Sequence, residues 1–269
     1  MAKPSRKITV PGLQALKTRR QRIVALTCYD YTTARLLNEA AVDVLLVGDS
    51  LGMVKLGYSS TLPVTVEDML YHTRIVAKGN SRCLLVTDMP YLSCQISPEQ
   101  AVENCGLMLK AGAEAVKIEG GSEILPMLEA LQRAKIPVMG HLGMMPQSVH
   151  QFGGYKVQGR DAEAARKLAA DARALERAGA FAIVLECVPS SLAKTISRAL
   201  SIPTIGIGAG AACDGQILVI DDLLGLTPAP LPRFVKRYAD LRNVIQQAAV
   251  RYGREVRSGR FPDAGHTYP

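Results

Sequence analysis

The sequence predicts a (β/α)8 TIM barrel in a single domain, for two reasons. Short apolar runs alternate with helical patterns along the chain, and four of these runs each end in one carboxylate. A continuous run of aliphatic residues is typical of a strand that is buried on both faces of a parallel sheet. If the strands are parallel, the four acids lie on one rim, where barrels of this kind build their active sites.

Eight apolar runs are expected to form the strands. They cover residues 23–26, 44–47, 83–87, 115–118, 137–140, 182–185, 203–207 and 216–220. The alternative is an open, doubly wound sheet, but no G-x-G-x-x-G motif follows the first strand. Eight strands with intervening helices in 269 residues therefore favour the closed barrel.

Helices are expected between these strands, at residues 31–39, 66–77, 98–110, 122–134, 161–178 and 190–200, and over much of 234–257. Thr65 is a plausible N-cap, and Ser97 followed by Pro98 is typical of a helix start. Residues 142–160 form a glycine-rich connection that is unusually long for this fold. Such connections are usually lids or binding loops.

The basic excess of the chain belongs to its two ends. Residues 1–29 carry seven basic groups and no acid, and residues 233–260 carry eight basic groups against two acids. Residues 30–232 have a net charge of −4. No basic patch with aromatic or helical readers is visible, so we expect no nucleic-acid partner. The prediction is one domain over residues 1–269, with a basic N-terminal capping segment and a helical C-terminus.

The cysteines and the apolar runs bear on the compartment. The six cysteines form no C-x-x-C pair, which favours buried free thiols in a reducing compartment. No apolar run approaches the ~18–20 residues of a membrane span, so no membrane association is expected. The acid-free N-terminus resembles a transit peptide, but globular patterning begins near Leu13. We therefore expect a cytoplasmic protein.

Three of the strand-end acids, Asp49, Asp88 and Glu119, are candidate metal ligands. Converging carboxylates repel one another, and a divalent cation is the simplest compensation. Oxygen ligands without a Cys/His cluster favour Mg²⁺ over Zn²⁺. The alternative is that one or more of these acids caps the helix that follows it.

Lys117 precedes Glu119 by two residues, so both side chains should project into the barrel mouth. There the lysine could pair with an anionic substrate, or it could form a plain ion pair with Glu119. Ser50 could donate to a substrate carboxylate or cap the next helix. His141 ends the fifth strand and could be functional or a satisfied structural residue.

Glu186 is the candidate general base. It follows an apolar run and precedes Cys-Val-Pro, and such surroundings disfavour the charged form and raise the pKa of a carboxyl group. The alternatives are a helix cap and a fourth metal ligand.

Seven motifs in register carry a family resemblance. They are Val47-Gly-Asp-Ser-Leu-Gly52, Thr61-Leu-Pro-Val-Thr65, Val116-Lys-Ile-Glu-Gly-Gly121, Gly140-His-Leu-Gly143, Phe152-Gly-Gly-Tyr-Lys-Val-Gln-Gly159, Leu185-Glu-Cys-Val-Pro189 and Gly206-Ile-Gly-Ala-Gly210. Together they resemble the ketopantoate hydroxymethyltransferase family, from about Leu13 to the C-terminus.

The resemblance implies a barrel of the phosphoenolpyruvate mutase and isocitrate lyase superfamily. It also implies Mg²⁺, 5,10-methylenetetrahydrofolate as co-substrate, and a cytoplasmic homodecamer of two pentameric rings. Residue by residue, it assigns the metal to Asp49, Asp88 and Glu119, and the proton acceptor to Glu186. It assigns the keto-acid contacts to Asp49, Ser50, Asp88 and Lys117, with His141 also in the mouth.

The implied reaction is hydroxymethyl transfer to 3-methyl-2-oxobutanoate through a Mg²⁺-stabilised enolate, in pantothenate and coenzyme A biosynthesis. A competing hypothesis is a superfamily lyase that cleaves a C–C bond in a 2-hydroxy dicarboxylate. That family usually carries a reactive cysteine in a Lys-Lys-Cys-Gly-type loop, which this sequence lacks. A non-catalytic barrel would be expected to have lost at least one acid of the set, and none is missing.

Overall fold

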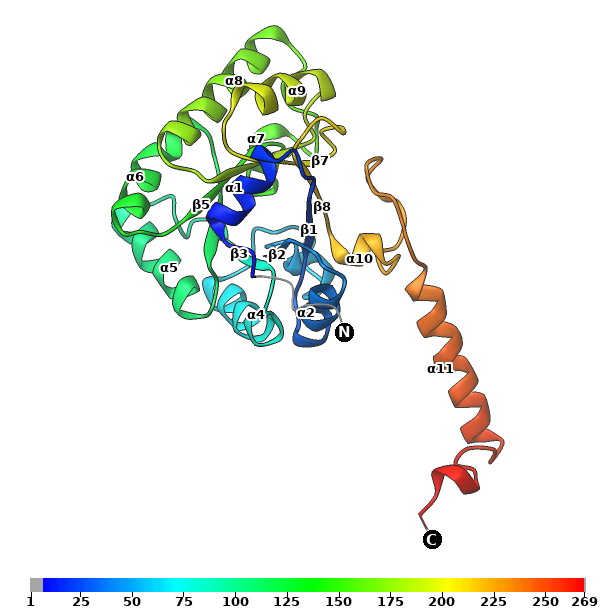
Figure 1. Cartoon of the computed structure of the whole chain (residues 1–269). Helices are drawn as coiled ribbons and strands as arrows, with labels where there is room; N and C mark the ends of the chain where they lie inside the picture. The colour runs from blue at the N-terminus through cyan, green and yellow to red at the C-terminus, as the bar shows by residue number, and fades with distance from the viewer. Residues whose placement is uncertain (1–6, 269) are drawn as a thin grey trace. The chain divides into compact units, whose positions relative to one another are not determined.

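Eight parallel strands pair in chain order and close into a barrel, which confirms the predicted fold (Figure 1). The computed structural model describes residues 7–268. The strands are β1 Ile23–Thr27, β2 Val44–Val47, β3 Leu84–Asp88, β4 Ala115–Glu119, β5 Val138–Gly143, β6 Ala182–Glu186, β7 Thr204–Ile207 and β8 Gly215–Leu218.

The eighth strand ends earlier than the sequence suggests. Its ladder with β1 runs from Gly215 to Leu218, and Ile220 already begins the short helix α10 (Ile220–Leu223). The expected strand over 216–220 is therefore wrong at its C-terminal end. Apolar character alone does not distinguish the last residues of a buried strand from the first turn of the next helix.

The helices of the barrel lie around the strands (Figure 1). They are α2 Tyr31–Glu39, α3 Leu51–Val54, α4 Val66–Gly79, α5 Pro98–Lys110, α6 Leu125–Arg133, α7 Val149–Phe152, α8 Ala162–Arg177 and α9 Ser190–Ala199. Both predicted caps are confirmed. Thr65 and Asp68 form a reciprocal capping box at α4, and the Ser97 side chain accepts from the Gln100 N–H at α5.

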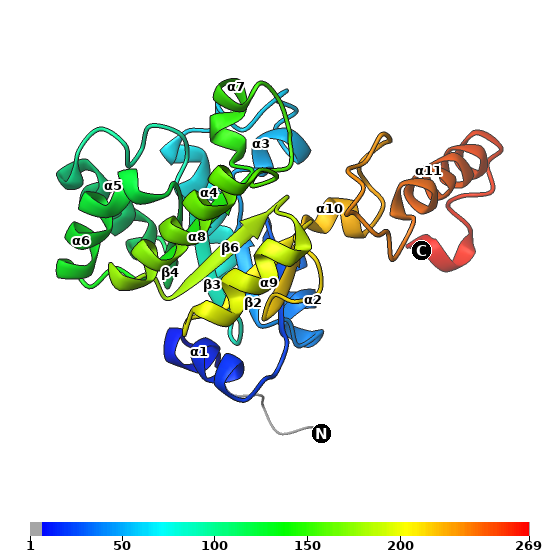
Figure 2. The ribbon, with the colours of Figure 1, turned by 90° about the horizontal axis from the view of Figure 1, so that it is seen from above.

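A helix that the sequence pattern did not predict, α1 (Val10–Thr18), lies near the N-terminus. Leu13 in this helix is fully buried and joins the apolar cluster of the barrel. Figure 2 shows α1 at the end of the barrel opposite α3 and α7. The helix thus closes the end of the barrel away from the carboxyl ends of the strands. Residues 1–6 of the expected basic capping segment lie outside the described residues.

The barrel interior is filled by side chains that alternate along each strand. The inward rows include Leu84 and Val86 of β3, Ala115 of β4, and Ala182 and Val184 of β6. Because the side-chain period of a strand is two, the next inward positions lie further toward the carboxyl ends of the strands. Those positions are polar, and they form the candidate site.

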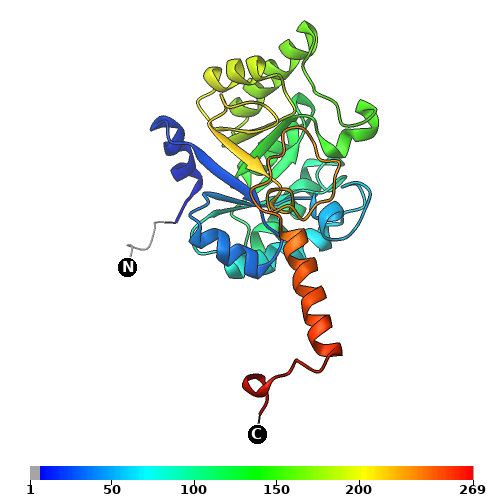
Figure 3. The ribbon, with the colours of Figure 1, turned by 90° about the vertical axis from the view of Figure 1, so that its right-hand side faces the viewer.

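Residues 220–268 form a second compact unit. It contains α10, α11 (Leu241–Arg257) and a short 3-10 turn, Ala264–His266. The long helix, orange in Figure 3, begins at Leu241 and not near residue 234. The Tyr238 N–H donates to Leu223 and the Leu241 N–H to Leu224, so α10 holds this backbone instead.

The expectation of one domain over residues 1–269 stays a prediction. None of the helices in residues 7–268 combines the length and the apolar character that crossing a membrane requires.

Candidate active site

The candidate site continues the inward rows of the barrel at the carboxyl ends of neighbouring strands. Asp88 follows Leu84 and Val86 on β3, and Lys117 and Glu119 follow Ala115 on β4. His141 lies opposite Glu119 in the register of β4 and β5, and Glu186 ends β6. Strand period and parallel register therefore bring these five side chains to one mouth.

Lys117 pairs with Asp88, not with Glu119. The distance from Lys117 Nζ to Asp88 Oδ1 is 2.7 Å, and both side chains are buried. Burial lowers the pKa of Lys117, but the charges of Asp88, Glu119 and Asp49 outweigh it and raise the pKa above its ordinary value. The ammonium is therefore a fixed positive charge among three acids, and the plain Lys117–Glu119 pair is not what the structure shows.

Asp49 lies just after β2, and its N–H donates to Asp88 Oδ2 at 3.1 Å. Burial and the charges of Asp88 and Glu119 raise the pKa of Asp49 to about 8. Burial also raises the pKa of Asp88, although Lys117 opposes this shift. Burial thus disfavours the ionised form of both acids, and the single charge of Lys117 does not offset this.

Gln147, which the sequence analysis did not single out, connects two of these acids. Its side-chain amide donates to Asp49 Oδ2 and to the Met89 carbonyl, both at 2.9 Å, and its backbone N–H donates to Glu119 Oε2 at 3.1 Å. The side chain is only 8% exposed. Within residues 7–268, its carbonyl oxygen Oε1 is buried without a hydrogen-bond partner. In the sequence, the only indication that Gln147 belongs to the site is its position in the long connection over residues 142–160.

His141 bridges the two glutamates of the mouth. Its Nδ1 lies 3.4 Å from Glu119 Oε1, and its Nε2 lies 3.3 Å from Glu186 Oε2. Burial and the Lys117 charge lower the pKa of His141, but the contacts with Glu119 and Glu186 outweigh them and raise it to about 9. His141 therefore lies against Glu186, whose side chain is 17% exposed and reaches the solvent of the mouth.

Ser50 lies beside the acids but does not cap α3, since its side chain makes no cap hydrogen bond. Its hydroxyl lies 2.8 Å from the hydroxyl of Tyr29, a fully buried residue that follows β1. This contact fixes the Ser50 side chain near the end of β2. The helix-cap alternative for Ser50 is therefore wrong.

The connection over residues 142–160 reaches across the mouth, as a binding loop or lid would. Besides the contacts of Gln147, the Tyr155 hydroxyl lies 4.0 Å from Met53 Sδ on α3, and the Gln158 N–H donates to Cys187. Burial and the charges of Glu186, Asp49 and Glu119 raise the pKa of Tyr155. The segment therefore contacts groups that follow β2, β3, β4 and β6.

The oxygen atoms of the mouth suit a hard divalent cation. Three buried carboxylates and the unpartnered Gln147 Oε1 are donors of the kind that Mg²⁺ prefers. Within residues 7–268, no three His, Cys, Asp or Glu side chains already form a ligand cluster.

Comparisons with known proteins identify the family of the chain. The family model of ketopantoate hydroxymethyltransferase matches residues 7–264. The chain belongs to the ketopantoate hydroxymethyltransferase family. It is 53% identical over 269 residues to the 3-methyl-2-oxobutanoate hydroxymethyltransferase of Pelobacter propionicus, with all of both chains covered. It is also 53% identical to that of Syntrophus aciditrophicus, with 98% of this chain and 97% of the relative covered. As a member of this family, the chain is a transferase.

Solved structures share the fold at low sequence identity. A 2,3-dimethylmalate lyase, described as a member of the PEP mutase/isocitrate lyase superfamily, has a TM-score of 0.61 at 17% identity, covering 97% of this chain and 89% of the lyase. A phosphonopyruvate hydrolase in complex with oxalate and Mg²⁺ has a TM-score of 0.60 at 14% identity, covering 96% of this chain and 93% of the hydrolase. These likenesses establish the fold alone.

Proposed function

We propose that this enzyme transfers a hydroxymethyl group from 5,10-methylenetetrahydrofolate to 3-methyl-2-oxobutanoate and so forms 2-dehydropantoate, the first committed step of pantothenate biosynthesis. Family membership supports the reaction, since relatives at 53% identity bear the corresponding name. The observation that carries the proposal is the convergence of buried acids with Lys117 at one mouth of the barrel. The enolate of a 2-oxo acid carries negative charge. Lys117, together with a cation held by the acids, can offset that charge.

Mg²⁺ would be held by Asp49, Asp88 and Glu119. Burial raises the pKa of both Asp49 and Asp88, and the charges of Asp88 and Glu119 add to the shift at Asp49; a divalent cation would stabilise the ionised form of both acids. When bound, the ion supplies a Lewis acid that polarises the keto group and makes the C3 proton removable. The phosphonopyruvate hydrolase that shares this fold was solved with oxalate and Mg²⁺, and oxalate resembles the two adjacent oxygens of a 2-oxo acid.

The 2-oxo acid would contact Asp49, Ser50, Asp88 and Lys117. Lys117 supplies the only ammonium that the structure places against the acids of the mouth within residues 7–268, so it can offset the charge of an enolate oxygen. The Ser50 hydroxyl, positioned by Tyr29, can donate to the substrate carboxylate. His141 belongs to the same mouth, and its Nε2 lies close to the Glu186 carboxylate.

Glu186 would remove the C3 proton. It ends the sixth strand, and His141 Nε2 lies 3.3 Å from its Oε2. Within residues 7–268, Glu186 forms no hydrogen bond or ion pair with Asp49 or Asp88. It can therefore act on the substrate without being a metal ligand. The C3 carbanion equivalent then forms a bond to the one-carbon unit of the folate; the bonds from that carbon to the folate nitrogens break, one water supplies the hydroxyl oxygen, and tetrahydrofolate leaves.

The same proposal includes a cytoplasmic homo-oligomer, a decamer as the family resemblance implies. All six cysteines are free of disulfide bonds, in keeping with a reducing compartment. The α11 helix has no buried residue, and Ile245, Tyr252 and Val256 recur on one face of it. Such a face is suited to a contact between subunits.

The test is direct synthesis. The enzyme is incubated with 3-methyl-2-oxobutanoate, 5,10-methylenetetrahydrofolate and Mg²⁺, and the product is identified by mass. Formation of 2-dehydropantoate, lost with EDTA and restored by Mg²⁺, is expected. Failure to form it with all three components present, or full activity after rigorous metal removal, would contradict the proposal.

A further inference from the structure

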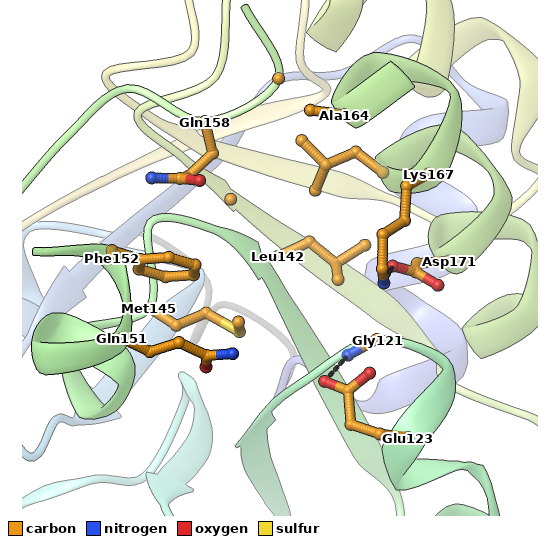
Figure 4. A pocket seen from close by; sticks show the side chains of 13 residues that line it. Gly121, Glu123, Leu142, Met145, Gln151, Phe152, Gln158, Ala164, Lys167 and Asp171 are labelled. Atoms are coloured by element: carbon orange, nitrogen blue, oxygen red, sulfur yellow. Dashed lines mark hydrogen bonds and ion pairs between the residues drawn. The ribbon is translucent and has the colours of Figure 1, made fainter. Parts of the chain in front are cut away.

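A cavity of about 280 Å³ lies beside the candidate site, in the first compact unit (Figure 4). Its walls come from the turn after β4, the end of β5 and the first turns of α8, represented by Gly121, Leu142 and Ala164. The connection over residues 142–160 supplies Phe152 and Gln158. None of these residues has been assigned to the reaction above.

The cavity adjoins the strand ends that carry the reaction. Gly121 comes two residues after Glu119, and Leu142 directly follows His141. The cavity-lining Gly143 packs against Glu186, since a Cβ atom at Gly143 would lie 2.1 Å from the Glu186 carbonyl oxygen. A molecule in the cavity would therefore lie next to the backbone of Glu119, His141 and Glu186.

Much of the lining suits a flat apolar ring. Leu142, Met145 and Phe152 supply apolar surface around the space (Figure 4), and Leu168 adds to it. Ligand sites typically combine such a lining with a few placed polar groups. The volume lies near the lower limit of about 300 Å³ for ligand pockets, which suits one fused ring system and excludes a whole folate.

The charged groups of the cavity select the kind of ring. Lys167 Nζ lies 2.6 Å from Asp171 Oδ2, so these two charges offset each other. Glu123 accepts a hydrogen bond from the Gly121 N–H at 2.8 Å through Oε1, and it forms no ion pair within residues 7–268. The three groups leave one negative charge, which disfavours an anion and favours a ligand edge that carries N–H donors.

We propose that this cavity binds the pterin ring of the folate co-substrate, with the Glu123 carboxylate accepting from the N3–H and 2-amino groups of the ring. This assignment rests on the proposed function. The two oxygens of the carboxylate can accept two charge-assisted hydrogen bonds from the two N–H groups on the 2-amino-4-oxopyrimidine edge of the ring. The glutamate tail of the folate, which is anionic, then lies outside the cavity.

The test measures binding of tetrahydrofolate and of 6-methyltetrahydropterin by calorimetry, with 3-methyl-2-oxobutanoate and Mg²⁺ present. Glu123→Gln keeps an oxygen acceptor for the Gly121 N–H but loses the negative charge. It should weaken binding of both compounds about tenfold or more. Ala164→Trp fills the cavity without changing its charge and should also weaken both. Glu163→Gln makes the same charge change on an exposed neighbour and should leave binding unchanged.

Unchanged binding of 6-methyltetrahydropterin by folded Glu123→Gln and Ala164→Trp proteins would overturn the inference, as would wild-type protein that binds no tetrahydropterin. The exchange of the C3 hydrogen of 3-methyl-2-oxobutanoate with deuterated water needs no folate and is measured in the same proteins. Exchange at the wild-type rate with weakened pterin binding is the expected result. Absence of exchange in the wild type would count against the proposed function, while the pterin titration reports on the cavity separately.

Discussion

Gln147 donates its side-chain amide to Asp49 Oδ2 at 2.9 Å, although the two residues are 98 positions apart in the chain. The same residue donates its backbone N–H to Glu119 at 3.1 Å. Gln147 therefore ties the connection over residues 142–160 to two of the acids in the mouth. Because one short segment contacts both acids, opening of this segment and access to the acids are coupled.

Replacing Gln147 with leucine should loosen that connection. The variant loses two buried hydrogen bonds and leaves their acceptors unsatisfied, which costs about 1–3 kcal/mol. Amide hydrogen exchange within residues 144–158 should then be about tenfold faster or more. Mass spectrometry of the exchanged peptides measures this. His150→Leu, an exposed position of the same segment, is the matched control, and equal exchange in both variants would refute the coupling.

Binding of Mg²⁺ should release a proton from Asp49. With a pKa of about 8 in the absence of metal, this carboxyl group is mostly protonated at pH 7 and must ionise to bind a cation. The affinity for Mg²⁺ should therefore rise with pH up to about 8 and then level off. Calorimetry in buffers of different ionisation enthalpy should detect a proton released at pH 7 and a smaller release at pH 9, where Asp49 is already ionised. A proton count near zero at both pH values would contradict the expected repulsion.

Lys117→Met should destabilise the metal-free enzyme. It removes the positive charge that lies 2.7 Å from Asp88 and leaves buried acids uncompensated. Breaking a buried pair in this way typically lowers the free energy of unfolding by about 3–5 kcal/mol. Urea denaturation measures the loss, and added Mg²⁺ should restore part of it. Lys110→Met, at an exposed position of α5, is the control. An equally small loss of stability in both variants would contradict this prediction.

The α11 helix provides a test of assembly. Ile245 and Val256 are 57% and 43% exposed and lie on one helical face. If this face is buried between subunits, Ile245→Asp should lower the mass measured by light scattering after size exclusion, because a buried unpaired charge is costly. Gln247→Asp, on the opposite face, should retain the mass of the wild type. A monomeric wild type at micromolar concentration would refute the oligomer.

The barrel could be predicted from the sequence because its strands and helix starts are each signalled by residues that are close together in the chain. Each strand is an aliphatic run, and the helix starts at Thr65 and Ser97 carry their own capping side chains. The convergence of Asp88, Lys117, Glu119, His141 and Glu186 followed from strand period and parallel register, both of which can be counted along the chain.

The remaining features depend on contacts that no local pattern reports. Gln147 reaches Asp49 only because the connection after β5 folds back over β2 and β3, and a glutamine in a loop carries no signal of that path. Likewise, Lys117 lies two residues from Glu119 and yet pairs with Asp88 of the adjacent strand. Pairing across strands depends on side-chain direction in the closed barrel, which sequence spacing within one strand does not give.

The role of Glu186 as proton acceptor is tested most directly by hydrogen exchange at C3 of 3-methyl-2-oxobutanoate. The reaction is followed by NMR in deuterated water with Mg²⁺ and without folate. Wild-type enzyme should exchange this hydrogen. Glu186→Gln should slow the exchange by about 10²–10⁴-fold, because the amide keeps the shape but cannot accept the proton. Binding of Mg²⁺ and the keto acid should change little. Exchange at an unchanged rate in Glu186→Gln would contradict the account and assign the base to another group of the mouth, such as His141.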